Sequence, residues 1–273
     1  MFIKQKIFVV FFLFSIILLA NNCTICGPDN EEEEKENIKL TILYDNYVFT
    51  NGTTSDWGFA CLVEGTEKTI LFDTGTKSDI LWHNIEKLNA DLSKVEQIVI
   101  SHNHGDHTGG LKSVLEKNSD VTVYLPFRFP GGFVDGVEEK GAKVIIADKP
   151  QEICKNVHLT GKMGTEIIEH SLILDTPKGL VIVTGCSHQG IVNILKKAKE
   201  ILDKDIYLVF GGFHLMRHSE EQVKEIIQEF KKLGVKQCGA THCTGDRAIA
   251  LFKEAFGDNY VQMGVGKVIE IAK

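Results

Sequence analysis

The chain has 273 residues, of which 43% are hydrophobic, and a formal net charge of -7. This length and composition allow a sizeable core, in one large domain or in two. The acidic balance argues against a nucleic-acid-binding surface, and no cluster of Lys and Arg opposes that conclusion. A phosphorylated small molecule is still allowed, because bound metal ions can supply local positive charge. We therefore expect a small-molecule substrate and no nucleic-acid partner.

The first 26 residues have the pattern of an export leader. Met1–Lys6 carries two lysines, and Ile7–Ala20 is an apolar run broken only by Ser15. This run has the length of a signal-peptide core and is short for a membrane span. Residues 1–26 are therefore predicted to be a signal peptide or a lipoprotein leader with lipid attachment at Cys23, with an uncleaved anchor as the alternative. The protein is predicted to be exported, periplasmic or at the cell surface, and to meet a membrane only through this leader.

Residues 27–37 form a predicted acidic linker, with four glutamates at 31–34, and residues 38–273 are the predicted domain. The chain has seven cysteines, at positions 23, 26, 61, 154, 186, 238 and 243. This odd and scattered set does not indicate a small disulfide scaffold. A bridge between Cys238 and Cys243 remains an alternative for an exported protein.

From residue 38 onward the sequence predicts two similar groups of strands and helices. The first group has strands at 40–49, 58–64 and 69–72, a helix at 79–92, a strand at 95–100, a helix at about 108–117, and strands at 121–125 and 143–147 around a Gly-rich loop at 130–136. The second group has a hairpin of 171–175 and 180–184, helices at 190–202, 219–233 and 246–256, and strands at 206–210, 235–240 and 268–271. Two such groups fit an α/β fold in which two sheets pack face to face with helices outside.

Residues 102–107 read His-Asn-His-Gly-Asp-His and directly follow an apolar predicted strand. Imidazole and carboxylate groups are ligands of zinc, iron and manganese. In an extended segment residues two apart share a side, so His102 and His104 can bind one ion. Asp106 and His107 lie near the start of the next helix, where they are offset enough to bind a second ion. The sequence therefore predicts a metal site.

Polar groups also end four other predicted strands. Asp73 could orient a ligand histidine. Cys186 and His188 carry a thiolate and an imidazole, which are good ligands, although a buried cysteine more often only packs. His214 follows two glycines and is either a substrate contact or an ordinary loop histidine, whereas His242 has the placement of a ligand. These groups converge if the ends of the strands line one edge.

On these residues the chain resembles the metallo-β-lactamase-fold superfamily, over about Ile38–Lys273. The resemblance rests on the 102–107 loop and on Leu71–Gly75 upstream of it. It implies a four-layer αββα sandwich with one or two metal ions at one edge. Three later segments resemble the subgroup named after a dihydropterin ribofuranosyl-aminobenzene phosphate synthase: Thr184–Gly190, Gly211–Leu215 and Thr241–Gly245.

The resemblance also implies a ligand set. One ion would be held by His102, His104 and His188, and the other by Asp106, His107 and His242, with Asp73 supporting the site from beneath. Zn²⁺ is expected, in one or two copies, with iron or manganese as alternatives. The superfamily usually has a Thr-Gly-Asp whose carboxylate bridges the ions, but here Cys186 replaces that Asp. The second ion is therefore expected to be weaker, different or absent, and His170 is a reserve ligand for His188.

The implied function is a hydrolase in which metal-activated water attacks an ester, lactone or phosphoester of a small molecule. Asp106 would bind metal and steer the proton of the nucleophile, and His214 would contact the substrate. One alternative is a transferase that joins a dihydropterin diphosphate to an aminobenzene ribofuranosyl phosphate; the predicted export argues against it, because pterin synthesis uses cytoplasmic intermediates. A further alternative is a non-catalytic domain that binds a metal or a small ligand.

Overall fold

The computed structural model describes Phe2 and residues 37–273. The predicted leader, its attachment point Cys23 and nearly all of the acidic linker lie outside the described residues. The predicted domain at 38–273 lies within them. No helix among the described residues combines the length and the apolar composition needed to cross a membrane.

Residues 37–273 form two sheets, of seven and six strands. The order in the first sheet is β13 (Val268–Ile271), β1 (Ile38–Tyr44), β2 (Ala60–Glu64), β3 (Thr69–Phe72), β4 (Val95–Val99), β5 (Thr122–Pro126) and β6 (Lys143–Ala147). The order in the second is β12 (Gln237–Thr241), β11 (Ile206–Gly212), β10 (Gly179–Thr184), β9 (Leu172–Thr176), β8 (Val157–Leu159) and β7 (Gln151–Cys154). Strands β3 to β6 run parallel, as do β10 to β12, so the carboxyl ends of each set meet at one edge.

Alternating side chains from both sheets build a core between them. Ile42 of β1 enters this core from the first sheet, and Val181 and Val183 of β10 enter it from the second. The intervening Leu180 and Ile182 face the opposite side of their sheet, as the two-residue period of a strand requires. Both sheets are therefore apolar on two faces, and each needs a second layer to cover its outer face.

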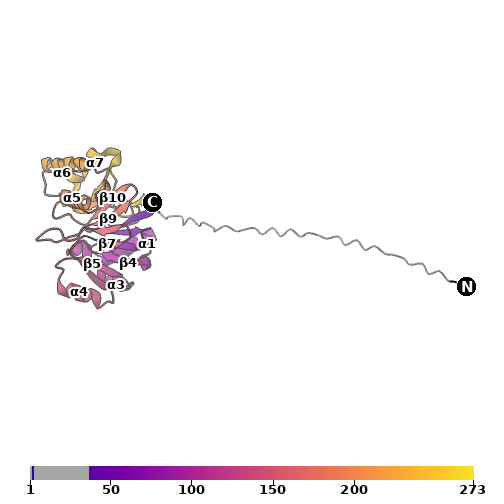
Figure 1. Cartoon of the computed structure of the whole chain (residues 1–273). Helices are drawn as coiled ribbons and strands as arrows, with labels where there is room; N and C mark the ends of the chain where they lie inside the picture. The colour runs from indigo at the N-terminus through magenta and orange to yellow at the C-terminus, as the bar shows by residue number, and fades with distance from the viewer. Residues whose placement is uncertain (1, 3–36) are drawn as a thin grey trace. The chain divides into compact units, whose positions relative to one another are not determined.

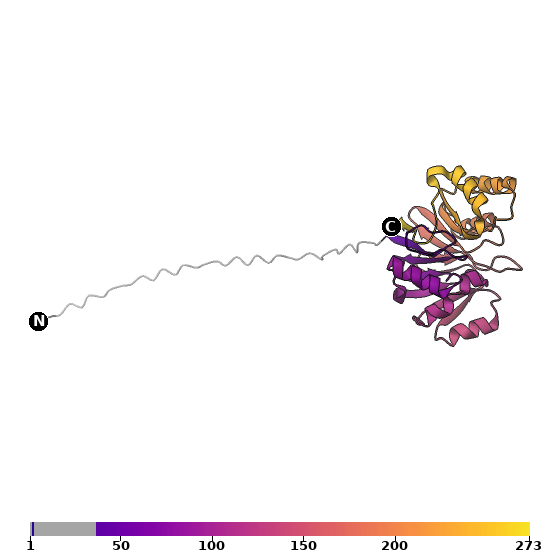
Figure 2. The ribbon, with the colours of Figure 1, turned by 180° about the vertical axis from the view of Figure 1, so that it is seen from behind.

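Helices supply that second layer. The first sheet is covered by α1 (Ser78–Leu88), α2 (Gly105–Thr108), α3 (Leu111–Leu115) and α4 (Gly131–Glu138), and the second by α5 (Ile191–Leu202), α6 (Glu220–Lys232) and α7 (Asp246–Phe256). Each side has its own core, around Leu81 and Ile98 on one side and Phe230 and Phe252 on the other. Short 3₁₀ helices lie at η1 (Leu92–Lys94), η2 (His242–Thr244) and η3 (Gly257–Asn259). The predicted four-layer αββα sandwich is confirmed (Figures 1 and 2).

Most predicted elements are present within a few residues of their predicted ends. The predictions for β3, β6, β13 and α7 match the observed bounds. Helix α6 begins, as predicted, at a Ser219 cap, where Ser219 and Gln222 form a reciprocal capping box. The strand predicted at 40–49 ends earlier, at Tyr44, because the next residue, Asp45, is fully buried and accepts hydrogen bonds from Thr241 of the other sheet.

Two predictions near the first sheet's helices were wrong, and one hairpin at the edge of the second sheet was missed. The Gly-rich loop predicted at 130–136 is helix α4, which forms because Phe133, Val134 and Val137 pack against the first sheet's outer core. The single helix predicted at about 108–117 is two helices, separated at Gly109, where a Cβ would collide with the backbone of Thr76. The hairpin of β7 and β8 was not predicted, since these strands have only four and three residues.

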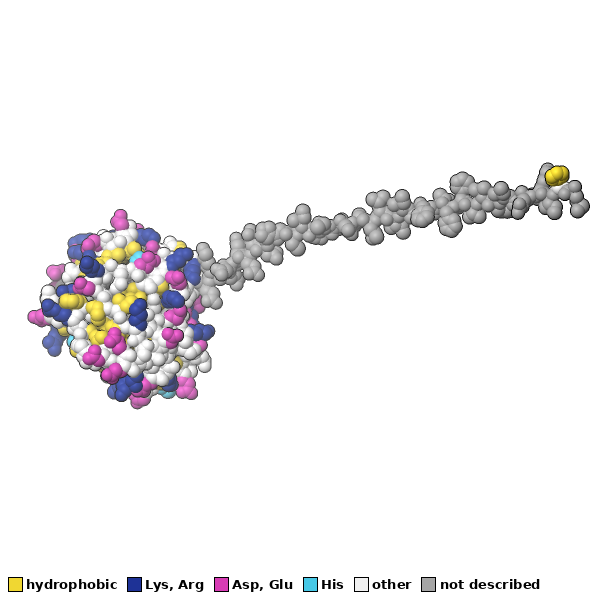
Figure 3. Space-filling model, turned by 60° about the horizontal axis from the view of Figure 1, so that its bottom comes forward, with side chains coloured by type: hydrophobic (Ala, Val, Ile, Leu, Met, Phe, Trp, Pro, Cys, Tyr) yellow, Lys and Arg dark blue, Asp and Glu magenta, His cyan; other side chains and the backbone are white. Residues whose placement is uncertain are grey.

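On the face of the domain shown in Figure 3, basic and acidic side chains are interspersed around patches of apolar surface. A mixed surface of this kind produces no large field of one sign.

Candidate metal centre

The predicted site residues do meet at one edge, where strands of both sheets end. In the first sheet, β3 leads into Asp73 and β4 leads into the 102–107 loop. In the second sheet, β10 leads into Cys186 and His188, and β12 leads into His242. Side chains from these segments form two groups of possible metal-ligand atoms. Within each group, all of the ligand atoms lie within 4.8 Å of one another.

The first group consists of His102, Cys186 and His188. Nε2 of His188 lies 3.3 Å from Nε2 of His102. His104 adjoins this group, with its Nδ1 atom 3.0 Å from Nε2 of His102 and its ring centre 5.0 Å from that of His188. Three imidazole nitrogens thus converge on one place, as predicted for the first ion.

The second group consists of Asp106, His107, Cys186 and His242. Nε2 of His107 lies 3.2 Å from the sulfur of Cys186 and 3.5 Å from Oδ2 of Asp106. Nε2 of His242 lies 3.5 Å from the same sulfur and 3.3 Å from the same oxygen. Two nitrogens, one sulfur and one oxygen form a donor set that fits a tetrahedral divalent ion such as Zn²⁺.

Cys186 belongs to both groups. It is buried, and its position between them is where a ligand shared by two ions would lie. The hydrogen-bonding contact with Cys243 and the burial raise the pKa of the Cys186 thiol well above its usual value. A bound cation acts in the opposite direction and favours the thiolate.

Asp73 organises the histidines from behind. It is fully buried, and its carboxylate accepts hydrogen bonds of 2.7 Å from the backbone N–H of Ser101, the Ser101 hydroxyl and Nδ1 of His107. The Ser101 oxygen in turn lies 2.9 Å from Nδ1 of His102. Gly185 makes room for this arrangement, because a Cβ there would collide with the Ser101 hydroxyl. The supporting role predicted for Asp73 matches these contacts.

His242 is oriented in the same way by a residue that the sequence did not reveal. Its Nδ1 atom lies 2.9 Å from Oδ1 of Asn46, which also accepts the backbone N–H of Gly58 at 3.1 Å. Because the Nδ1 atoms of His102, His107 and His242 are all engaged, each ring presents Nε2 to the ligand groups. Fixing the tautomer in this way is characteristic of metal-binding histidines.

Three of the ring ligands are neutral and suit a cation, whereas His107 carries a proton that a bound ion would have to displace. Burial lowers the pKa of His102, and it lowers those of His188 and His242 to about 4, so all three are neutral ligands at neutral pH. Burial alone would lower the pKa of His107, but the charge of Asp73 and the hydrogen bond of Asp106 raise it to about 10. Burial opposes ionisation of Asp106, yet its hydrogen bonds with His107 and His242 lower its pKa and keep it a carboxylate.

Trp57 is a second site residue that the sequence did not reveal. Its side chain is 45% exposed, although it is a large aromatic. Nε1 donates a 2.8 Å hydrogen bond to Oδ2 of Asp106, and the indole lies 5.0 Å from the ring of His242. Trp57 therefore holds the carboxylate in place and forms a wall of the site that a substrate can reach.

His214 lies on the opposite side of the first group. Its ring centre is 4.3 Å from that of His188, and both line a cavity of about 220 Å³. Partial burial lowers the pKa of His214, so the ring is neutral at neutral pH. Its backbone has a φ of 55°, a strained value for a residue other than glycine that directs this side chain toward the site. The predicted substrate contact is consistent with this position.

The segment before β9 contributes a buried acid beside the ligands. Glu169 pairs with His102 in an isolated antiparallel bridge, and neither of its buried carboxylate oxygens has a hydrogen-bond partner among the described residues. Burial raises the pKa of Glu169 to about 7. The next residue, His170, is buried outside both ligand groups, and His188, for which it was the reserve, lies within the first group. The five cysteines described are all free, so the alternative bridge between Cys238 and Cys243 is also wrong.

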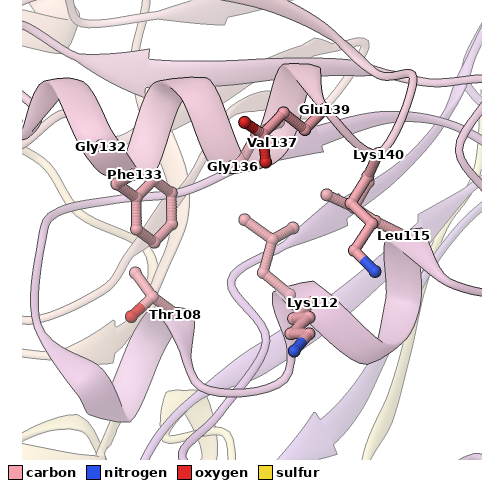
Figure 4. Close-up of a pocket in the computed structure, with 10 residues that line it drawn as sticks. Thr108, Lys112, Leu115, Gly132, Phe133, Gly136, Val137, Glu139 and Lys140 are labelled. Carbon is pink, nitrogen blue, oxygen red and sulfur yellow. The ribbon is translucent and has the colours of Figure 1, made fainter.

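A separate cavity of about 430 Å³ lies between α3 and α4 (Figure 4). Phe133 of α4 and Leu115 of α3 line it, together with Lys112 and Lys140. None of the ligand residues described above lines it. Its size therefore does not identify it as the reaction site.

Comparison with known proteins agrees with this geometry. A family model described as "Metallo-beta-lactamase superfamily" matches residues 58–191. The chain is 30% identical, over 285 residues, to the 7,8-dihydropterin-6-methyl-4-(β-D-ribofuranosyl)-aminobenzene-5'-phosphate synthase of Methanocaldococcus jannaschii, and the match covers 86% of this chain and 97% of that protein. This chain belongs to the metallo-β-lactamase superfamily.

Two solved structures of the superfamily's fold extend the comparison. The structure of Tm1679, described as a metal-dependent hydrolase of the beta-lactamase superfamily, is 32% identical, with a TM-score of 0.73 over 86% of this chain and all of Tm1679 (100%). The metallo-beta-lactamase fold protein YhfI of Bacillus subtilis is 15% identical with a TM-score of 0.62, over 85% of this chain and 99% of YhfI, a likeness that concerns the fold alone. The predicted superfamily and subgroup resemblance are thus confirmed. The synthase and Tm1679 carry names that point to different reactions, so membership of the superfamily does not decide the reaction.

Proposed function

We propose that the protein is a metal-dependent hydrolase that uses a metal-activated water on an ester, lactone or phosphoester of a small molecule. The observation that carries this proposal is the pair of ligand groups that share the sulfur of Cys186 at one edge of the fold. The similarity to Tm1679 along nearly the whole domain supports it.

The proposed ions are one or two Zn²⁺, with iron or manganese as alternatives. His102, His104 and His188 would hold one ion, Asp106, His107 and His242 would hold the other, and Cys186 would contact both. When bound, such ions supply Lewis acidity, which polarises the scissile bond and lowers the pKa of water to about 7. The residues present fit this role, because their imidazoles, carboxylate and sulfur match the donors that these metals prefer, provided that His107 gives up its ring proton when an ion binds.

The remaining contributions come from the side chains around the two groups. Asp106 is an acceptor that can orient the proton of the nucleophile, and the N–H of Trp57 keeps its Oδ2 atom in place. The neutral ring of His214 offers one donor and one acceptor to a substrate bound beside His188. Buried Asp73 keeps His107 and, through Ser101, His102 in their ligating orientation.

A transferase is the second candidate, and one observation favours it. The relative from Methanocaldococcus jannaschii, with which this chain shares 30% identity, is a synthase. In a transferase, an aromatic amine would take the place of water and a dihydropterin diphosphate would be the other substrate. The proposed export of the chain argues for the hydrolase, since pterin intermediates are cytoplasmic.

The test is a metal analysis coupled to a substrate panel. The purified protein is expected to contain about one to two divalent ions per chain and to hydrolyse at least one ester, lactone or phosphodiester. His104→Ala should lose metal and activity together, whereas His83→Ala, whose ring lies 3.1 Å from the carbonyl of Gly52 and belongs to neither ligand group, should keep both. A fully stable protein that binds no metal would refute the enzyme proposal. Product formation from a dihydropterin diphosphate and an aromatic amine, without hydrolysis of any panel member, would establish the transferase instead.

A further inference from the structure

A second pocket adjoins the proposed metal centre on the side of His104. It has a volume of about 360 Å³ and lies between two loops, one that follows β5 and one that precedes β9. This volume falls within the range of about 300–1,000 Å³ that is usual for small-molecule sites. Because Asn103 and His104 form its floor, a molecule bound there lies directly beside the first ligand group.

The wall that follows β5 is aromatic and basic. It consists of Phe127, Arg128 and Phe129. The guanidinium carbon of Arg128 lies 5.5 Å from the ring centre of Phe127, and Nζ of Lys162 lies 4.5 Å from the same centre. Neither cation makes an ion pair with any residue that the structure describes. Two unpaired positive charges beside one ring stand out in a protein with a net charge of -7.

The backbone conformation of this wall is unusual. Arg128 has a φ of 65°, in the left-handed region that residues other than glycine seldom adopt. Such a conformation persists only where the surroundings impose it, and it places the Arg128 side chain on the pocket wall.

The opposite wall is a short, tightly held loop. Met163 and Glu169 pair through two backbone hydrogen bonds of 2.9 and 3.0 Å, which close the loop between them. Glu169 also pairs with His102, so this loop is anchored to the metal-binding segment. Its residues on the pocket are Thr165, Glu166, Ile167 and Ile168. The exposed Glu166 is the one acid that lines the pocket, opposite the basic wall.

We propose that this pocket binds the aromatic, anionic part of the substrate. A planar ring would lie between the phenylalanines and the isoleucines, and its acidic group would face Arg128, with the charge of Lys162 beside Phe127 adding to the attraction. An N–H or O–H on the ring would face Glu166. The scissile bond would then lie beyond His104, at the ligand groups. This assignment rests on the proposed function and narrows its substrate class to aromatic acids that carry a hydrogen-bond donor.

Binding of naphthalene-2-sulfonate to the metal-loaded protein tests the assignment, because a sulfonate is a weak metal ligand and the ring is fluorescent. The expected order of affinity is naphthalene-2-sulfonate first, with 1-octanesulfonate and 2-naphthalenemethanol each about tenfold weaker, since each lacks one of the two recognised features. Equal affinity for all three would overturn the proposal.

Two pairs of variants locate the binding. Arg128→Gln and Phe127→Leu should each weaken naphthalene-2-sulfonate binding about five- to tenfold. Their matched controls, Lys267→Gln and Phe49→Leu, alter another aromatic and basic pair, in which Nζ of Lys267 lies 4.8 Å from the ring centre of Phe49. The controls should leave the affinity unchanged; weakening by the controls alone would place the probe at that other pair and overturn the assignment.

The pocket assignment and the proposed hydrolase function can fail independently of each other. Arg128 and Phe127 belong to neither ligand group, so their variants should retain full metal content and full hydrolysis of small substrates that do not reach the pocket. Normal metal content and hydrolysis with unchanged probe binding in Arg128→Gln would reject the pocket while leaving the hydrolase proposal intact. Loss of metal from the wild type would reject the hydrolase proposal without reference to this pocket.

Discussion

Asp73 accepts a hydrogen bond from Nδ1 of His107 at 2.7 Å, and neither side chain is exposed to solvent. The pair joins the end of β3 to the metal-binding loop, across 34 residues of sequence. The same carboxylate holds Ser101, so one buried acid sets the orientation of two histidines. Removal of the Asp73 carboxylate should therefore weaken metal binding more than it destabilises the fold.

Asp73→Asn should lower the affinity for Zn²⁺ by about 10–100-fold, the usual effect of removing a carboxylate that orients a ligand histidine. Competition with a chelator of known affinity measures this change. Asp79→Asn, at an exposed carboxylate in the first turn of α1, is the matched control and should bind as the wild type does. Equal affinities for the two variants would contradict the role assigned to Asp73.

Cys186 should be a metal ligand through its thiolate. Substitution of the native metal by Co²⁺ should produce a near-ultraviolet sulfur-to-cobalt charge-transfer band, because only a coordinated thiolate gives this absorption. Cys186→Ser should lose the band and weaken binding of both ions. Cys154→Ser, a half-buried cysteine at the edge strand β7, should keep the band. A band that survives in Cys186→Ser would show that this sulfur is not a ligand.

Trp57 should report metal binding through its fluorescence. Its indole N–H is bonded to Asp106 and its ring lies near His242, so coordination of those two residues changes the surroundings of the ring. The chain has two tryptophans, and Trp82→Phe leaves Trp57 alone. In that variant, adding Zn²⁺ to metal-free protein should change the emission, and a chelator should reverse the change. Trp57→Phe, which retains Trp82, should show little response.

Gly185→Ala should disturb the site through a single methyl group. The added Cβ would collide with the Ser101 hydroxyl and lie 3.0 Å from Oδ2 of Asp73. Overpacking of this kind typically costs about 1–3 kcal/mol of unfolding free energy, and here it should also reduce metal content. Gly131→Ala is the control, since a Cβ there meets nothing within 4 Å. Chemical denaturation and metal analysis of both variants measure the difference.

His170 should make the stability of the protein sensitive to acid. Burial lowers its pKa from the ordinary 6.5 to about 4, and neither ring nitrogen has a hydrogen-bond partner among the described residues. Unfolding lets the ring take up a proton, so the stability contributed above pH 6.5 is lost as the pH falls toward 4, at about 1.4 kcal/mol per pH unit. In metal-free protein, His170→Leu should lose less stability than the wild type over this interval. Parallel losses in guanidinium denaturation at pH 7 and pH 5 would contradict this.

The sequence pointed to the residues of the candidate metal centre because they are concentrated where strands end. His102, His104, Asp106 and His107 lie within six residues, and a strand-ending position also marked His242. Residues that orient the ligands carried no such local pattern. Asn46 contacts His242 across 196 residues, and only the packing of the two sheets brings them together.

The wrong prediction of a loop at α4 has a similar explanation. Helix α4 contains Gly131, Gly132 and Gly136, which locally favour a loop, but Phe133 and Val137 gain enough from burial against the first sheet to stabilise a helix. Tertiary contacts therefore overrode local preference, and these contacts could not be inferred from the segment alone.

The sulfur of Cys186, common to both ligand groups, makes their occupancy interdependent. The first proposed ion to bind would have to displace the proton from a thiol whose pKa is raised, so its apparent affinity would include that penalty. A second ion would meet a sulfur that is already deprotonated, which would favour cooperative loading, although repulsion between the cations would oppose it. A titration should consequently pass from empty to doubly filled protein with little of the singly filled form, most clearly at low pH.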